Sequence, residues 1–334
     1  MDDEVLIHDP ATIGPDDILV LRAIGLGDAL TSVAALRGIR HGWPHQRIVL
    51  AAPASTGQWL ASKGLVDRVL PTTGLDPLPQ LPGGHLAINL HGRGPQSHRV
   101  LAAGNPRELI AFGCPASGHE GIEWRPEEHE VHRWCRLVNE NGGSCGPRDL
   151  RLRLPADPGP AAVVVLHPGA AAAARRWPAS RWRELARRLS DEGRRVVVTG
   201  SAAEAELADS VARGLPGVTS VAGRTSLPEL ADLVRDAAVV VSADTGIAHL
   251  ATAYGVRSVV LYGPVSPSLW GPIIDLDRHT VLWHGTEDSP PGDPHGTECD
   301  PLLARLDVEE VAAAVTAQLL MGEAHVVPPP GDVA

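Results

Sequence analysis

The feature that most constrains the fold is an alternation of short apolar runs with longer amphipathic segments. Each run has four to six residues and is mostly unalternated, which is typical of parallel strands buried on both faces. Amphipathic helical patterns separate the runs, and strand–helix repetition of this kind predicts a doubly wound α/β fold. The expected strands are 18–21, 48–51, 86–90, 162–167, 195–199, 238–242 and 258–262, and the expected helices are 29–40, 179–192, 203–213, 227–235 and 246–253.

The 334 residues suffice for two domains of ordinary size. A proline-rich stretch without periodicity, Leu154–Pro160, lies between two strand-rich halves and reads as a linker. We therefore expect two Rossmann-like domains facing across a cleft, 1–158 and 159–334. A last helix at about 307–320 can pack back on the first domain.

The composition and the hydropathy pattern disfavour some classes of partner. The net charge of −11 disfavours a nucleic acid, and no apolar run is long enough to span a membrane. The acidic start of the chain does not resemble a signal peptide. The four cysteines, Cys114, Cys135, Cys145 and Cys299, form no CxxC pair, so a reducing cytoplasm is expected.

The first candidate site follows the first strand and reads Arg22-Ala-Ile-Gly-Leu-Gly-Asp28. Gly25 and Gly27 allow close approach of the backbone to a ligand, and Asp28 sits at a helix N-terminus. The alternative is that Asp28 only caps that helix. A dinucleotide fingerprint is disfavoured, because position 30 is Leu and Ala51-Ala52-Pro53 offers no acidic residue.

Three further loops follow later strands. His167-Pro-Gly169-Ala leads to Arg175-Arg176-Trp-Pro, which suits a phosphate or is a solvated loop. Asp244-Thr245-Gly246-Ile-Ala-His249 opens a helix whose first amides can face an anion, and Asp244 and His249 share a face. Tyr-Gly263-Pro ends a strand and is expected to line the same crevice.

Taken together, these segments resemble glycosyltransferase family 9, the ADP-heptose heptosyltransferase-like enzymes of the GT-B fold. The resemblance rests on Leu26-Gly-Asp-Ala29, His167–Ala170 with Arg175–Pro178, Gly223-Arg-Thr-Ser-Leu227, Asp244–His249 and Tyr262–Pro264, in that order. It implies a nucleotide-sugar donor bound by the second domain, an acceptor bound by the first, and an inverting transfer without a metal ion or cofactor.

The resemblance also implies roles for single residues. Asp28 matches the general base, Arg175 a phosphate-binding lysine, and Thr245 with Gly246 the diphosphate cradle. Asp244 matches the contact to donor-sugar hydroxyls, His249 supports the phosphates and Glu204 aligns with a ribose-binding acid. Thr225 and Leu227 are expected near the adenine. His167, Gly169 and Gly263 complete the donor set, and Gly25, Gly27, Asn89 and His91 form the acceptor set.

Two departures bear on the substrate. Asn89 stands where the family often has Asp, and the segment His279–Asp300 carries histidines, Cys299 and acids in a spacing that fits no zinc pattern. We expect that segment to be a solvated loop. Since no basic amphipathic helix for a membrane surface is visible, we expect a soluble small-molecule acceptor such as an antibiotic precursor.

Alternatives remain. The first is a lipopolysaccharide core heptosyltransferase, and the others are a GT-B sugar-nucleotide epimerase and a non-catalytic nucleotide-sugar binder. A phosphorylase is disfavoured because the one lysine, Lys63, lies in no pyridoxal-binding motif.

Overall fold

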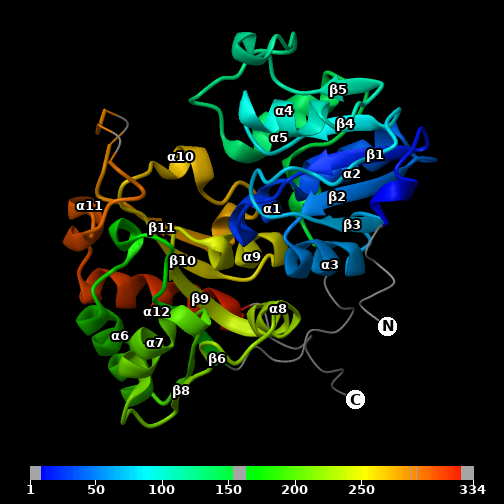
Figure 1. The fold of residues 1–334 in the computed structure, drawn as a ribbon. Coiled ribbons are helices and arrows are strands. Elements are labelled where there is room, and N and C mark those ends of the chain that lie inside the picture. The colour runs from blue at the N-terminus through cyan, green and yellow to red at the C-terminus, as the bar shows by residue number, and fades with distance from the viewer. Residues whose placement is uncertain (1–8, 153–162, 287, 291, 325–334) are drawn as a thin grey trace, which may run out of the picture. The chain divides into compact units, whose positions relative to one another are not determined.

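A computed structural model describes residues 9–152, 163–286, 288–290 and 292–324 (Figure 1). The chain divides into two compact units, Met1–Leu152 and Arg153–Ala334. The expected linker and the expected boundary at 158/159 lie outside the described residues. Each unit is an α/β domain built on a parallel sheet, which confirms the predicted fold class.

The first unit holds a parallel sheet in the order β3-β2-β1-β4-β5. Its central strands are mostly apolar and buried, and Leu19, Leu21, Val49 and Ala87 lie in one core cluster. The elements are β1 (Asp17–Leu21), α1 (Leu26–Thr31), α2 (Val33–Gly42), β2 (Arg47–Ala52), α3 (Ala54–Ser62), β3 (Arg68–Pro71), β4 (Leu86–Asn89), α4 (Gln96–Ala102), β5 (Glu108–Ile110) and α5 (Glu130–Asn139).

The second unit holds a parallel sheet in the order β11-β10-β9-β6-β7-β8. Its core contains the strand residues Val164, Leu166 and Val241, the loop residue Trp177 and the helix residue Trp182. The elements are β6 (Val163–His167), α6 (Ala179–Asp191), β7 (Arg195–Val198), α7 (Ala205–Ala212), β8 (Val218–Ser220), α8 (Leu227–Arg235), β9 (Ala237–Ala243), α9 (Gly246–Tyr254), β10 (Ser258–Leu261), α10 (Pro267–Trp270), β11 (His279–Leu282), α11 (Pro301–Arg305) and α12 (Val308–Ala324).

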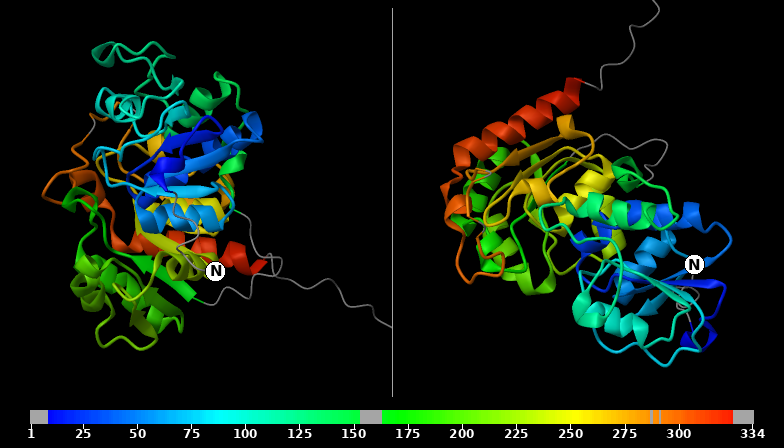
Figure 2. Two further views of the ribbon diagram at one scale, coloured as in Figure 1. Left: turned by 45° about the vertical axis from the view of Figure 1, so that its right-hand side comes forward. Right: turned by 90° about the horizontal axis from the view of Figure 1, so that it is seen from above.

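The last helix packs on its own unit. Val311, Val315 and Leu319 of α12 are buried in the core of the second unit, against β9, β10, β11 and α6 (Figure 2). The expectation that a helix at 307–320 also packs back on the first domain stays a prediction. The apolar face of α12 is used to cover the sheet of the second unit.

The expected helix 29–40 is divided in two. Ser32 separates α1 from α2, and its hydroxyl donates a hydrogen bond to the carbonyl of Ala29 at 2.7 Å. The hydroxyl of Thr31 donates to the carbonyl of Asp28 at 2.9 Å. Short hydroxyl side chains compete for helical carbonyls in this way, and they often bend helices.

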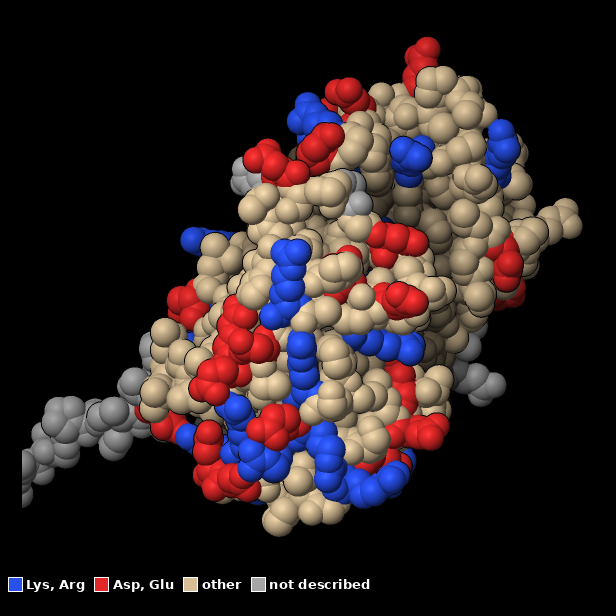
Figure 3. Space-filling view, turned by 90° about the vertical axis from the view of Figure 1, so that its left-hand side faces the viewer, with Lys and Arg blue, Asp and Glu red and all other residues tan. Residues whose placement is uncertain are grey.

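The surface of α6 is neutralised locally. Arg187 lies 2.8 Å from Glu184, and Arg188 lies 2.6 Å from Glu309 of α12. The hydrogen bonds from Arg187 and Arg188 lower the pKa of Glu184 to about 2. On the face drawn in Figure 3, basic and acidic side chains are intermixed. Among the described residues, no helix has the length and hydropathy needed to cross a membrane.

Candidate functional site

In both sheets the first strand lies in the middle, and the chain departs from it in opposite directions. Ligands of open α/β sheets bind beyond the carboxyl ends of the strands at such a point. In the first unit this point lies between β1 and β4, where Leu21 is paired with Asn89. In the second unit it lies between β6 and β9, where His167 is paired with Ser242. Each unit therefore has one candidate site.

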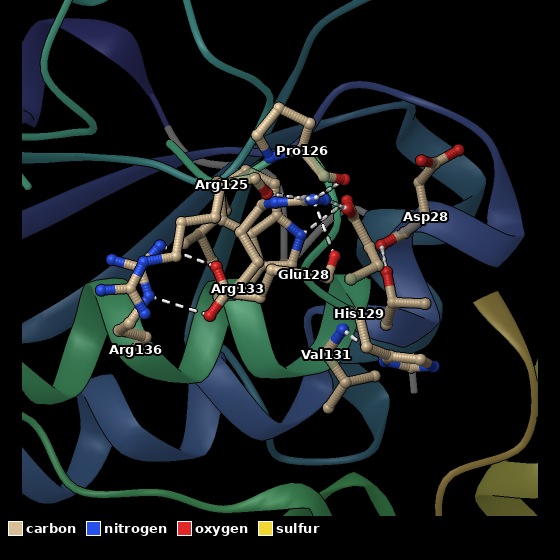
Figure 4. Close-up of polar contacts among 12 residues, drawn as sticks. Asp28, Arg125, Pro126, Glu128, His129, Val131, Arg133 and Arg136 are labelled. Carbon is tan, nitrogen blue, oxygen red and sulfur yellow. Dashed lines mark hydrogen bonds and ion pairs between the residues drawn. The ribbon is translucent and has the colours of Figure 1, made fainter. Parts of the chain in front are cut away.

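The candidate site of the first unit contains Asp28. Gly25 is the N-cap of α1, so Asp28 stands in the first turn of the helix and not at the cap position. The side chain of Asp28 is 31% exposed. In Figure 4 its carboxyl group points away from the labelled arginines. A partly exposed carboxylate at a strand end can accept a proton from a bound hydroxyl.

Arg22 links Asp28 to the interior. Its Nε donates to the backbone oxygen of Asp28 at 2.8 Å, and its Nη2 lies 3.6 Å from Asp28 Oδ1. The same Nη2 is 3.1 Å from Glu130 Oε1 of α5. Arg22 is 1% exposed and its guanidinium lies 4.8 Å from the ring of Trp134. Neither Arg22 nor Glu130 is among the site residues expected from the sequence.

Only one signal in the sequence pointed to this cluster. Arg22 directly follows a fully buried strand, which is an unusual place for a cation. Its partner Glu130 is 108 residues further along the chain, and nothing in a single sequence indicates that the two residues form a pair.

Asn89 and His91 shape the loop after β4. Asn89 is fully buried, its Oδ1 accepts from the backbone of His91 at 3.0 Å, and its Nδ2 lies 2.9 Å from Ser97 Oγ. His91 Nδ1 accepts from the backbone of Ala23 at 3.3 Å. Burial, reinforced by Arg22, lowers the pKa of His91 to about 4. Both side chains thus fix the loop beside Asp28, and the amide of Asn89 is engaged within the unit.

The candidate site of the second unit brings four strand ends together. The loops after β7 and β8 are joined, since the backbone of Gly223 donates to Gly200 at 2.9 Å. His167 at the end of β6 lies 2.9 Å, between Nδ1 and Oγ1, from Thr199 after β7. Thr225 and Leu227 are half-buried, and Leu227 begins α8 after its N-cap Ser226.

Glu204 lies directly above Gly169. Its Oε2 accepts hydrogen bonds from the backbone and the hydroxyl of Ser201 at 2.7 and 2.8 Å. Burial opposes ionisation of Glu204, but these hydrogen bonds, with His167 and Arg176 nearby, lower its pKa. The pKa of His167 is also lowered, chiefly by burial. At neutral pH this corner therefore offers a carboxylate beside a neutral imidazole.

Arg175 and the loop after β9 lie next to each other. Arg175 Nη1 donates to the backbone oxygen of Asp244 at 3.3 Å. The Nε of Arg175 is buried and has no hydrogen-bond partner among the described residues. Thr245 is the N-cap of α9, and its hydroxyl lies 3.4 Å from the carbonyl of Ala243. A guanidinium with unused donors beside a helix N-terminus is suited to a phosphate.

His249 lies on the same side of α9 as Asp244, as the spacing predicted. Its Nε2 is 4.0 Å from Asp244 Oδ1, and its ring centroid is 6.1 Å from that of Trp270. Asp244 is 8% exposed. Burial raises the pKa of Tyr262 well above its usual value, and Asp244 adds to this, so the phenol of Tyr262 stays protonated.

Gly263 has a packing role. A Cβ at this position would lie 2.8 Å from Leu303 Cβ of α11, and Trp283 Nε1 donates to its carbonyl at 3.2 Å. The segment 279–300 is also not the plain loop that was expected. His279 is buried in β11 and its Nδ1 lies 2.9 Å from Ser258 Oγ, while Asp300 caps α11.

Fold and sites together define a chain of the GT-B class of glycosyltransferase folds. The profile of glycosyltransferase family 9 (heptosyltransferase) matches residues 125–291, and the chain belongs to this family. Among solved structures, the ADP-heptose LPS heptosyltransferase II of E. coli has a TM-score of 0.73 at 21% identity, covering 92% of this chain and 99% of that chain. A family 9 glycosyltransferase of Veillonella parvula has a TM-score of 0.74 at 18% identity, covering 94% and 100%.

Relatives by sequence match shorter stretches. Lipopolysaccharide heptosyltransferase 1 of Pseudomonas aeruginosa is 41% identical over 117 residues, which is 35% of this chain and 32% of the relative. Lipopolysaccharide heptosyltransferase 1 of Escherichia coli is 38% identical over 155 residues, 43% and 48% of the two chains. The chain thus matches about a third of the length of the first relative and about half of the length of the second.

Proposed function

We propose that this protein is an inverting, metal-independent glycosyltransferase that moves a heptose from an ADP-linked donor to a hydroxyl group. The donor assignment is carried by the environment of Arg175. Its buried, unpartnered Nε and its contact with Asp244 supply cationic donors beside the start of α9. Such a group can stabilise the charge that develops on a leaving diphosphate without a metal ion.

For the donor residues we propose the roles that the family resemblance implies. We assign the diphosphate to Arg175, Thr245 and Gly246, with His249 in support, and the sugar hydroxyls to Asp244. The ionised Glu204 suits ribose hydroxyls, with the His167–Gly169 loop beneath it. Thr225 and Leu227 are assigned to the adenine. Gly263 acts through packing, because its Cβ position is already filled by α11.

The transfer step uses Asp28 as general base. The acceptor hydroxyl gives its proton to the Asp28 carboxylate while its oxygen forms a bond to the anomeric carbon. The bond from that carbon to the diphosphate oxygen breaks, and ADP leaves with the electron pair. Because the nucleophile attacks opposite the leaving group, the anomeric configuration is inverted. General-base catalysis of this kind contributes about 10²- to 10⁴-fold.

The acceptor is proposed from the relatives. Those named above are lipopolysaccharide heptosyltransferases, so a heptose-deficient lipopolysaccharide core is better supported than the soluble antibiotic precursor that the sequence analysis favoured. Gly25 and Gly27 adjoin Asp28 in the chain, and the loop of Asn89 and His91 is bonded to Ala23 after the same strand; we assign these residues to the acceptor side.

The test incubates the full chain with ADP-heptose and either a heptose-deficient core or a panel of soluble sugars, and follows ADP release and product mass. We expect transfer to the core that is unchanged by EDTA and reduced at least 100-fold in Asp28→Asn. Transfer to soluble sugars alone would show that the acceptor is a soluble sugar and not the core. Release of ADP from ADP-heptose without an acceptor would indicate a hydrolysing enzyme instead, and isomerisation of ADP-heptose would indicate an epimerase.

Donor binding is measured separately. Thermal stabilisation is compared for ADP, GDP, UDP and dTDP, since a ligand at 100 times its dissociation constant adds about 2.7 kcal/mol. A shift with ADP, with or without magnesium, supports the donor assignment. Stabilisation by ADP without any turnover in the wild-type protein would indicate a nucleotide-sugar binder.

A further inference from the structure

Behind Asp28 lies a buried chain of alternating charges, formed by Arg22, Glu130 and Arg133. Arg22 is 1%, Glu130 4% and Arg133 6% exposed. Buried charges are costly unless they are paired and hydrogen-bonded. Each of the three is paired here, and the chain ends at Asp28, whose side chain is the most exposed of the four.

The guanidinium of Arg22 contacts three parts of the unit. It donates to Asp28 and Thr31 of α1, to the carbonyl of Leu90 after β4, and to Glu130 of α5. Its planar fork makes these contacts in fixed directions. Arg22 donates to the backbone oxygen of Asp28 and lies 3.6 Å from its carboxylate, so it constrains both the start of α1 and the charge beside the carboxylate.

Glu130 in turn fixes Arg22. Its Oε1 accepts from Trp134 Nε1 at 2.8 Å, and its Oε2 accepts from Arg133. Arg133 donates to three backbone carbonyls of the segment before α5, at Arg125, Pro126 and Glu128 (Figure 4). Its guanidinium also lies 4.2 Å from the ring of Trp124. The carboxylate of Glu130 therefore has little freedom to move.

We propose that Arg22, oriented by Glu130, is a positioning residue that holds the Asp28 carboxylate ionised and aimed at the acceptor hydroxyl. This inference rests on the proposed role of Asp28. An arginine next to a carboxylate favours the charged form, and that form is the one a general base requires. The other titratable groups around this corner are His91 after β4, with a pKa of about 4, and His129 at the start of α5.

The test separates charge from geometry. In Arg22→Gln the acidic limb of the pH profile of kcat/KM is expected to move to higher pH by about 1 to 3 units. Arg22→Lys keeps the positive charge, so its acidic limb should move by less than half of the shift seen in Arg22→Gln. Its kcat should still fall, because lysine lacks the planar guanidinium that makes several hydrogen bonds in fixed directions. The KM for the donor is unchanged in both variants, since the donor residues belong to the second unit.

A control variant, a second variant of the cluster and an NMR titration distinguish loss of the positioning role from general loss of folding or of activity. Arg136→Gln breaks the ion pair of α5 with Glu128 and should leave the acidic limb in place. Glu130→Gln keeps the shape of α5 and should lower kcat with donor affinity unchanged. The carboxyl carbon of Asp28, observed by ¹³C NMR and assigned through Asp28→Asn, should titrate at higher pH in Arg22→Gln than in the wild type.

The outcomes distinguish this inference from the proposed function. An unshifted Asp28 titration in folded Arg22→Gln, or an equal shift in Arg22→Lys and Arg22→Gln, would overturn the positioning role. If Arg22→Gln does not fold, an unchanged kcat in both Arg22→Lys and Glu130→Gln would overturn it. Absence of any sugar transfer by the wild type would instead refute the proposed function, and the NMR titration would still test the inference.

Discussion

Gly169 lies against the carboxyl group of Glu204, and a Cβ on Gly169 would stand 2.2 Å from the carboxyl carbon. The carboxyl group of Glu204 thus packs against the loop after β6 and accepts hydrogen bonds from the backbone and the hydroxyl of Ser201. Glycine is required at position 169 by this close approach and not by a left-handed backbone, which only glycine adopts readily.

Gly169→Ala is therefore expected to displace the Glu204 carboxylate and weaken ADP binding. Because the group displaced is the free end of a flexible side chain, the melting temperature should change little. ADP affinity, measured by calorimetry, should fall as far as in Glu204→Ala, and the double variant should fall no further. The control is Gly146→Ala, where the space is open. Wild-type affinity in Gly169→Ala, beside a loss in Glu204→Ala, would contradict this.

Arg175→Met is expected to weaken ADP binding by about 10-fold or more, since a hydrogen bond to a charged group contributes roughly 1.5–3 kcal/mol. Adenosine lacks the phosphates, so its binding should be unaffected. Arg175→Lys should recover part of the loss. Arg183→Met serves as the control, because Arg183 donates to the carbonyls of Ser210 and Val211 on α7. Equal losses for ADP and adenosine would show that Arg175 does not contact the phosphates.

The sequence predicted the central strands and missed the sheet edges. The seven expected strands correspond to β1, β2, β4, β6, β7, β9 and β10. The strands that it did not indicate, β3, β5, β8 and β11, stand at the edges of the two sheets. An edge strand is covered on fewer sides. Glu108 and Thr219 are accordingly exposed, and the unbroken apolar run that marks a buried strand is missing.

The candidate sites divide in a similar way. Asp28, Arg175 and the Asp244–His249 motif could be predicted because each follows a buried strand within a few residues. Arg22, Glu130 and Trp134 could not be assigned a joint role, because their contacts depend on how α5 packs against the end of β1. Local patterns indicate where a loop lies, whereas the pairing of buried charges is a property of tertiary packing.

His91 predicts a dependence of stability on pH. Its pKa in the folded protein is about 4, lowered by burial and by Arg22, while an unfolded histidine titrates near 6.5. The unfolded chain therefore binds a proton that the folded protein excludes. The stability should be fully present above about pH 6.5 and fall as the pH drops toward 4.

His91→Asn should flatten this pH dependence between pH 7 and 4.5, measured as the free energy of unfolding in urea. Part of the dependence should remain, because burial also lowers the pKa of His85 and His98. His45→Asn, which removes an exposed ring, is the control. An unchanged slope in His91→Asn would show that this imidazole is not excluded from protonation.

Glu128 predicts a second pH effect in a more acidic range. Its carboxylate forms a two-point ion pair with Arg136, with contacts of 2.8 and 2.7 Å, and both side chains are 14% exposed. Burial opposes ionisation of Glu128, but Arg136 outweighs it, so the pKa of Glu128 in the folded protein is lowered. This stabilisation is present above the usual pKa of a glutamate and is lost as the pH falls through the lowered value.

Glu128→Gln should therefore lower the free energy of unfolding at pH 7 by about 1–3 kcal/mol, because Arg136 loses its charged partner. The difference from the wild type should shrink as the pH falls below about 4.5, because the glutamate of the unfolded chain then binds a proton that the folded carboxylate still excludes. Glu140→Gln is the matched control, since Glu140 is half exposed and lies 3.9 Å from the same arginine. A destabilisation of Glu128→Gln that persists undiminished at low pH would mean that packing, and not charge, accounts for the contribution of Glu128.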